Sequence, residues 1–159
     1  MSTEANFVTK RGLHALRERL RTIKEVDRPQ NVQDIEEALA HGDLSENAEY
    51  HAAKERQGFI DAEKRDIEDK LSRAQMIDPA TLSGDRVVFG AKVTLLNIDT
   101  AEEVSYQIVG VDEANLKSGT ISYESPLARA MIGKEEGDEV VFQAPGGART
   151  YEIVEVGFG

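Results

Sequence analysis

The sequence has no cysteine, and it has no long hydrophobic run. Without cysteine, disulfide bonds and thiol catalysis are excluded, and the composition fits a reducing compartment. No eighteen apolar residues follow one another, and Met1–Asn6 lacks the basic and apolar pattern of a signal peptide. We therefore expect a cytoplasmic protein that has no membrane partner.

Basic charge is also scarce. The chain has 19 lysine and arginine residues against 30 aspartate and glutamate residues, which gives a formal net charge of -11. Proteins bind nucleic acid backbones by replacing counterions with basic side chains, so direct binding to free nucleic acid is disfavoured. If the protein acts near nucleic acid, we expect another macromolecule to bring it there.

Helical periodicity dominates the first half of the 159 residues. From Thr9, the expected N-cap, to about Ala40, apolar residues recur at spacings of three and four, as in an amphipathic helix. These residues are Leu13, Leu16, Leu20, Ile23, Val32, Ile35 and Leu39. The phase slips around Arg28–Pro29, where proline removes a backbone donor and is expected to kink or interrupt the helix.

A second helix is expected from Leu44 to about Ala74, after a turn at His41–Gly42. Its predicted inner face contains Ala48, Ala52, Phe59, Ala62, Ile67, Leu71 and Ala74. When the chain folds back at Gly42, the apolar stripes of the two arms coincide. Two arms of roughly thirty residues predict an antiparallel coiled coil about 45 Å long, which we assign to a first domain of residues 1–78.

Beyond Asp78–Pro79 the apolar period becomes that of β-strands. The predicted strands are Val87 to Phe89, Ala91 to Leu96, Val104 to Val111, Gly119 to Tyr123, Glu139 to Gln143 and Tyr151 to Val156. A hairpin turn is expected at Pro145–Gly147, and one short helix at Pro126–Ile132 with Ser125 as its N-cap. Residues 79–159 are therefore predicted to form a β-rich second domain, and the chain is assigned to the α+β class.

The turn between the two predicted helices is acidic. Asp43, Glu46 and Glu49 lie within seven residues that include no lysine or arginine. Asp43 and Glu46 are three apart, so a helix restarting at Leu44 would project both from one arc of its first turn. Two such oxygen ligands can share a hard cation such as Mg²⁺. The alternative is a capping box, with Asp43 as N-cap and Glu46 at the third helical position.

Other polar residues near the turn have simpler interpretations. We expect Glu49 to orient or pack the first turn of the second helix. His41 and His51 are ten apart and have no third ligand, so solvation or local hydrogen bonds are expected rather than a metal site. Lys54 and Arg56 are candidates for contact with RNA phosphate, although on an exposed helix face such residues more often serve solubility and pair with nearby acids.

Two blocks of the sequence resemble one family. The string from His41 to Glu55, followed by Gln57–Phe59, closely resembles the hairpin tip of the bacterial transcript cleavage factors of the Gre family, the GreA type in particular. The second half resembles the same family in Val88–Ala91, Tyr106–Gly110, Ser125–Ala130, Ile132–Lys134 and Ala144–Gly147. The resemblance covers nearly the whole chain.

The resemblance implies a coiled coil followed by a domain of FKBP-like fold. In this family the second domain docks on RNA polymerase at the mouth of its secondary channel, and the coiled coil passes down the channel to the active centre. Asp43 and Glu46 correspond to the two tip acids, which would help hold the second Mg²⁺ of the polymerase and position a water. The factor itself would then be no enzyme and would bind no ion tightly when free. The polymerase would hydrolyse the backtracked transcript, and the nascent RNA 3' end would be met only inside that complex.

The chain departs from common family members at two positions near the turn. Leu39 stands where many relatives have a basic residue, and Ser45 occupies a position that is sometimes lysine. Either change could weaken contact with RNA, for which Lys54 and Arg56 are then the nearest remaining cations.

Three rival functions follow from the same features. A relative could enter the channel and inhibit the polymerase without promoting cleavage, although the intact pair of Asp43 and Glu46 argues against this. A peptidyl-prolyl isomerase or chaperone needs a deep aromatic pocket, and the second half has no tryptophan and no motif that gathers its aromatic residues. A plain coiled-coil adaptor explains the apolar stripes but not the acidic turn.

Overall fold

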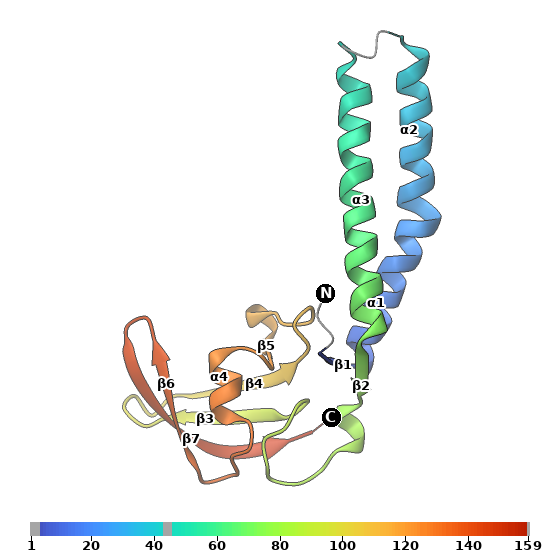
Figure 1. Cartoon of the computed structure of the whole chain (residues 1–159). Helices are drawn as coiled ribbons and strands as arrows, with labels where there is room; N and C mark the ends of the chain where they lie inside the picture. Colours follow the sequence, from blue (N-terminus) through green and yellow to red (C-terminus); the bar gives the residue numbers. More distant parts are fainter. Residues whose placement is uncertain (1–3, 43–45, 159) are drawn as a thin grey trace. The chain divides into compact units, whose positions relative to one another are not determined.

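The computed structural model describes residues 4–42 and 46–158 (Figure 1). The fold is mixed α+β, with a helical hairpin and a separate curled β-sheet. It forms two compact units. The first contains Leu13–Ala74 and Glu4, and the second contains Ala5–Gly12 and the described residues from Gln75 onward. No helix in these ranges is long and apolar enough to cross a membrane.

The first arm of the hairpin is a helix with one irregular turn. It comprises α1 (Lys10–Thr22), a π-helical turn (Ile23–Asp27) and α2 (Arg28–Ala40). In the π turn the Arg28 N–H bonds the carbonyl of Ile23, one residue further back than in an α-helix. Pro29, which has no N–H to donate, lies directly after this turn in the first turn of α2. The interruption predicted at Arg28–Pro29 is thus confirmed. It takes the form of a π turn in the five residues before Arg28.

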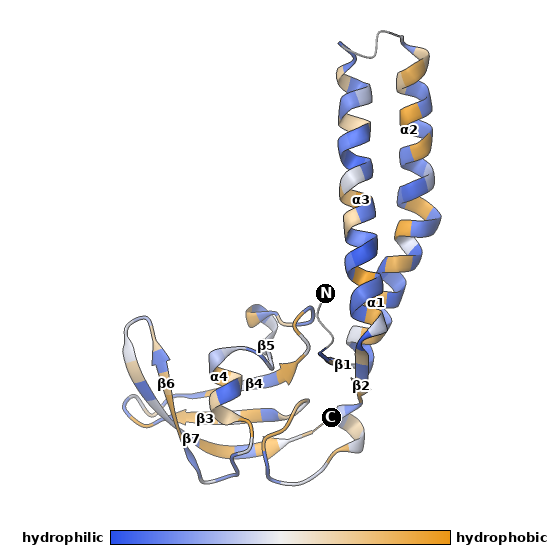
Figure 2. Ribbon diagram, in the orientation of Figure 1, coloured by the Kyte–Doolittle hydropathy of each residue, from blue (hydrophilic) through white to orange (hydrophobic). Residues whose placement is uncertain are grey.

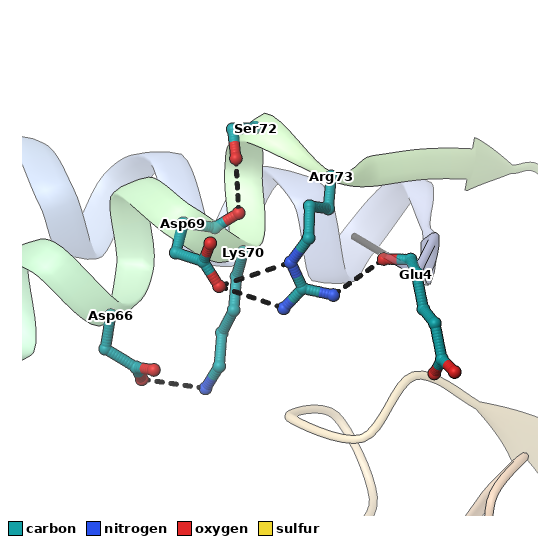
Figure 3. Close-up of polar contacts among 6 residues, drawn as sticks. All are labelled: Glu4, Asp66, Asp69, Lys70, Ser72 and Arg73. Carbon is teal, nitrogen blue, oxygen red and sulfur yellow. Dashed lines mark hydrogen bonds and ion pairs between the residues drawn. The ribbon is translucent and has the colours of Figure 1, made fainter. Parts of the chain in front are cut away.

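The second arm is α3 (Ala48–Ser72), which is shorter than predicted at both ends. It begins at Ala48 because Asn47 has extended backbone angles and caps the helix. Its C-cap is Arg73. The Arg73 guanidinium binds Asp69 Oδ2 at 3.1 and 3.2 Å and the Glu4 carbonyl at 2.7 Å (Figure 3). Strand β2 (Ala74–Ile77) follows directly, where the second helix was expected to end.

The two arms pack through a narrow apolar strip. Ile23, Ile60 and Ile67 are buried, and Leu16, Leu20 and Leu71 pack against them. Further toward the turn, the buried residues within the described part of the hairpin are Asn31, Ala38 and Ala53. Figure 2 accordingly shows α3 as mostly hydrophilic, with hydrophobic residues at intervals.

The predicted inner faces are wrong by about one residue in this region. Val32, Leu39 and Phe59 are 45%, 45% and 66% exposed. Ala48, Ala52 and Ala62 are exposed as well. In the first arm the π turn adds one residue, which brings Asn31 onto the same face as Ile23, whereas the predicted Val32 lies about 100° further around the helix. In the second arm Ile60 takes the place predicted for Phe59, about 100° further around the helix.

Ion pairs between the arms flank this strip. The Arg19 guanidinium donates to Glu63 Oε1 and Oε2 at 2.7 and 2.8 Å, and it also lies 3.1 Å from Asp27 in the π turn. The hydrogen bonds from Arg19 lower the pKa of the Glu63 carboxyl. Arg28 pairs with Asp61 at 2.7 Å. Exposed pairs of this kind stabilise the packing of the two arms only weakly.

The second unit is built on a five-stranded sheet with the strand order β5-β4-β3-β7-β6. The strands are β3 (Lys92–Asn97), β4 (Glu103–Val109), β5 (Thr120–Ser122), β6 (Glu139–Ala144) and β7 (Gly147–Gly157). Only β4 and β5 pair in parallel, and the other neighbours are antiparallel. The register pairs Ala144 with Gly147, which confirms the predicted hairpin turn.

One helix, α4 (Pro126–Met131), completes the core of this unit. Ser125 caps it by accepting a bond from the Ala128 N–H at 3.3 Å, as predicted. Ala128 and Met131 are fully buried with the inner residues of the sheet. The buried cluster comprises Val87, Ala91, Val93, Leu95, Ile108, Ile121, Ala128, Met131, Val140, Ile153 and Val156.

Two short strands were not predicted, and one predicted strand is absent. Residues Asn6–Thr9 form β1, which pairs with β2. Val87–Phe89 is not a strand, although Arg86 makes an isolated bridge with Glu135. Phe89 instead packs against Phe7 and Tyr123, with ring centroids 6.0 and 5.6 Å away. The N-terminal strand thus contributes an aromatic ring to the second unit.

Glu113 fastens the end of β1 within this unit. Its Oε2 accepts bonds from the Thr9 N–H at 3.0 Å and the Gly110 N–H at 2.9 Å, and the Thr9 hydroxyl donates to its Oε1. The same hydroxyl accepts a bond from the Gly12 N–H at 3.1 Å, which confirms Thr9 as the cap of α1. A Cβ at Gly12 would overlap the Glu113 carboxyl. Residue 12 must therefore be glycine for this contact to form.

We predict opposite effects for two Gly→Ala substitutions within helices. Gly58 in α3 has open space around its missing Cβ, so Gly58→Ala should raise the free energy of unfolding by about 0.5 to 1 kcal/mol. Gly12→Ala should lower it by about 1 to 3 kcal/mol, because the methyl group displaces Glu113. Urea unfolding of both variants checks this. Stabilisation by Gly12→Ala would contradict the close contact between Gly12 and the Glu113 carboxyl.

We also predict that Ile60, and not its neighbour Phe59, stabilises the hairpin. Ile60→Ala should lower the free energy of unfolding by about 2 to 4 kcal/mol, because it leaves a cavity between the arms. Phe59→Ala should change it by no more than about 0.5 kcal/mol, because the ring is largely exposed. Urea unfolding followed by helical circular dichroism measures both. A larger loss of stability in Phe59→Ala than in Ile60→Ala would instead support the inner face predicted from the sequence.

Candidate functional site

The candidate site is the turn that joins the two arms of the hairpin. Helix α2 ends at Ala40, and Gly42 has a φ of +74°, a left-handed conformation that glycine adopts without strain. The predicted closure of the first arm at His41–Gly42 is thus confirmed. Asp43 and Ser45 lie outside the described residues, so their assigned roles stay predictions.

Asn47 connects the two helix ends through its carboxamide. The side-chain oxygen accepts a bond from the Tyr50 N–H at 3.0 Å and so caps α3. The side-chain nitrogen donates to the carbonyls of Ala38 at 2.7 Å and Gly42 at 3.2 Å, at the end of α2. One residue therefore caps the start of α3 and also hydrogen-bonds the end of the first arm. Sequence reasoning missed this role, although asparagine before a helical segment is a usual N-cap signal.

Glu46 lies in a turn one residue before this cap, and its side chain is exposed. It is not in the first turn of a helix, as the predicted start at Leu44 required. The capping-box alternative is wrong as well, because it needs Glu46 at the third helical position and the cap of α3 is Asn47. Among the described residues none donates a hydrogen bond to the Glu46 carboxylate, so its oxygens keep their lone pairs for another ligand.

A second link between the arms lies beside this cap. His41 Nδ1 is 3.0 Å from Glu49 Oε2, and both side chains are mostly exposed. His41 is thus mostly exposed with an acidic neighbour, and Glu49 is oriented toward the opposite arm. His51 instead makes an edge contact with the Tyr50 ring, with centroids 5.6 Å apart. The two histidines therefore have different partners.

The two cations proposed to contact RNA lie on α3 below the turn. The Lys54 ammonium donates to Gln57 Oε1 at 2.8 Å. Arg56 borders a shallow hollow of about 560 Å³ between α2 and α3. The other residues around this hollow are Asn31, Asp34, Glu37, Ala38, His41, Glu49, Ala52 and Ala53. At its floor the buried Asn31 amide donates to the Ala53 carbonyl at 2.9 Å.

Metal binding depends on how the histidine and acidic side chains of the described residues are grouped. Within residues 4–42 and 46–158, no three histidine or acidic side chains are grouped closely enough to hold a metal ion. A carboxylate such as that of Glu46 could serve as one ligand of Mg²⁺, which is often bound through one or two carboxylates and keeps several waters.

Comparison with known proteins assigns both halves of the chain to one family. A family model described as "Transcription elongation factor, N-terminal" matches residues 6–76, and one described as "Transcription elongation factor, GreA/GreB, C-term" matches residues 82–158. Transcription elongation factor GreA of Halorhodospira halophila is 60% identical over 150 residues, covering 94% of this chain and 95% of that protein. The GreA of Alkalilimnicola ehrlichii is 57% identical with the same coverage.

Solved structures of similar chains also exist. The crystal structure of GreA factor homolog 1 (Gfh1) of Thermus thermophilus is 28% identical and covers 96% of this chain and 99% of its own, with a TM-score of 0.45. The two family models and the GreA relatives cover most of the sequence. The chain therefore belongs to the GreA/GreB family of transcription elongation factors.

Proposed function

We propose that this protein binds RNA polymerase, inserts its hairpin into the secondary channel and stimulates the Mg²⁺-dependent cleavage of backtracked RNA by the polymerase. The observation that carries the proposal is the placement of Glu46. This acid lies outside α3 and is exposed in the turn that joins the two long helices. Its carboxylate is not used as a helix cap, so it is available to an ion supplied by a partner.

The shape of the hairpin supports insertion into a narrow channel. Helix α3 has 25 residues, which at 1.5 Å per residue is about 38 Å. Its buried residues Ala53, Ile60 and Ile67 are spaced by seven, as are Asn31 and Ala38 on α2. A repeat of seven is typical of a coiled coil. We therefore propose that the arms form an antiparallel coiled coil only two helices wide.

The chemistry of the tip residues supports a shared ion rather than one bound by this chain alone. Asp43 and Glu46 would supply two carboxylate ligands, and the polymerase would supply the others. Mg²⁺ held in this way would activate the attacking water and neutralise charge on the phosphate. The contribution of this chain is to place the two carboxylates, which cleave nothing by themselves.

Charge and the second unit fit the same proposal. A net charge of -11 disfavours tight binding of the factor to nucleic acid as it enters a channel that handles RNA. We propose that the second unit has the FKBP-like fold and docks on the polymerase. Its five-stranded sheet with a single core helix supports this fold. Lys54 and Arg56 remain proposed contacts of the nascent RNA 3' end.

We predict that Asp43→Ala combined with Glu46→Ala abolishes stimulated cleavage without preventing binding. Loss of both proposed Mg²⁺ ligands should reduce the stimulated rate by at least about 100-fold, because even partners of metal ligands contribute 10- to 100-fold. The assay adds the protein to a backtracked polymerase complex with labelled RNA and follows shortening of its 3' end. Polymerase affinity is measured in parallel.

The matched control is Asp66→Ala combined with Glu68→Ala. It removes the same two charges from α3, where these acids form only exposed ion pairs with Lys70 and Lys64 (Figure 3 shows the pair with Lys70). We expect this control to retain stimulation. Cleavage that persists in the Asp43/Glu46 variant would refute the proposal, and equal loss in the control would show that only net charge matters.

A further inference from the structure

We propose that Asn47 is the positioning residue for Glu46, and that its carboxamide sets where the Glu46 carboxylate stands. The inference rests on the function proposed above. It starts from an observation that the proposed function does not use: one side chain caps α3 and binds the end of α2. Asn47 is adjacent to Glu46, so the backbone from which that acid projects is fixed on its C-terminal side.

The bond to Gly42 closes the turn. Asn47 Nδ2 lies 3.2 Å from the Gly42 carbonyl oxygen, and the two residues flank the segment that carries Asp43 and Glu46. This bond holds Asn47 against the end of α2, which limits the positions open to the adjacent Glu46 before any partner is met. The Glu46 carboxylate then needs less ordering when it meets an ion.

The bond to Ala38 fixes the turn to the opposite arm. Asn47 Nδ2 lies 2.7 Å from the carbonyl oxygen of Ala38, which is 2% exposed. Among the described residues near the turn, the buried ones are Asn31, Ala38 and Ala53, and none of them is a large apolar residue. The exposed pair of His41 and Glu49 adds a weak second link. The Asn47 amide is thus a direct hydrogen-bonded tie between the arms at this end of the hairpin.

The arrangement requires the chemistry of asparagine. The carboxamide presents an acceptor to the Tyr50 N–H and two donor hydrogens to the carbonyls of Ala38 and Gly42. Aspartate keeps the acceptor, and therefore the cap, but it has no hydrogen to donate when ionised. Serine also caps well, but its hydroxyl is shorter and has only one hydrogen. These two substitutions separate the capping of α3 from the tie to α2.

The experiment compares full-length Asn47→Ser and Asn47→Asp with Asn31→Ser. Asn31 is the matched control, because it is the other asparagine amide that crosses between the arms, with a 2.9 Å bond to the Ala53 carbonyl. For each variant we measure polymerase affinity, the maximal cleavage rate at saturating protein, and the Mg²⁺ concentration that gives half of this rate. In the free protein we measure amide hydrogen exchange of His41 and Gly42, whose N–H groups bond the carbonyls of Ala38 and Leu39.

We expect both Asn47 variants to lower the maximal rate by about 10- to 100-fold and to raise the half-saturating Mg²⁺ concentration, with polymerase affinity changed less than about twofold. Amide exchange at His41 and Gly42 should become about tenfold faster. Asn47→Asp adds a negative charge beside the proposed ligands, which by itself would favour Mg²⁺, so its loss of rate would come from the missing donor. Asn31→Ser should keep the rate and the Mg²⁺ dependence.

Three results would overturn the inference. The first is an unchanged rate and Mg²⁺ dependence in Asn47→Ser. The second is full activity of Asn47→Asp, which would show that capping alone is sufficient. The third is an equal loss in Asn31→Ser, which would reduce Asn47 to a general stabiliser of the hairpin. If Asp43→Ala with Glu46→Ala abolishes cleavage while the Asn47 variants do not, only the positioning role fails. Persistent cleavage in that double variant instead refutes the proposed function.

Discussion

A hairpin of two helices has no third layer to bury its apolar residues, so each arm can hide only one narrow strip against the other. Here that strip is hydrophobic only in its lower part, where Ile23, Ile60 and Ile67 meet. Toward the turn it consists of two alanines and the Asn31 amide, and beyond them of the Asn47 carboxamide. The end of the hairpin that carries the candidate site is therefore held by directional hydrogen bonds. These bonds fix the relative positions of the two arms more narrowly than apolar contact does.

The two units are stabilised by different kinds of interaction. The second unit buries a cluster of aliphatic side chains between its sheet and α4, as an independent folding unit requires. The hairpin relies on a small apolar cluster, interhelical ion pairs and amides, and it leaves most of its surface charged. The two units therefore depend on different interactions for their stability.

The sequence was sufficient to predict the two helical arms, the closure at Gly42 and the start of α4, because each depends on a local signal. The pattern at Ser125–Pro126 and the glycine after α2 are signals of this kind. The exposed Phe59 was not predictable from its type, because the buried face depends on how many residues the π turn contains and where α3 begins. Strands β1 and β2 were missed since each has only four residues, and their pairing joins segments far apart in the sequence. The role proposed for Glu46 depended on the resemblance, because an acid beside a helix is in itself an ordinary feature.

The hydrogen bonds between Glu113 and Thr9 mean that the C-terminal folding unit includes residues from the start of the chain. A fragment that starts after residue 78 would contain the whole five-stranded sheet and still be incomplete. Glu113 would lose the two hydrogen bonds from Thr9, and the rings of Phe89 and Tyr123 would lose Phe7 as a neighbour. The N-terminal strand thus belongs physically to the C-terminal body. During synthesis, the C-terminal unit can complete its fold only by packing against the N-terminal strand β1, which was synthesised much earlier.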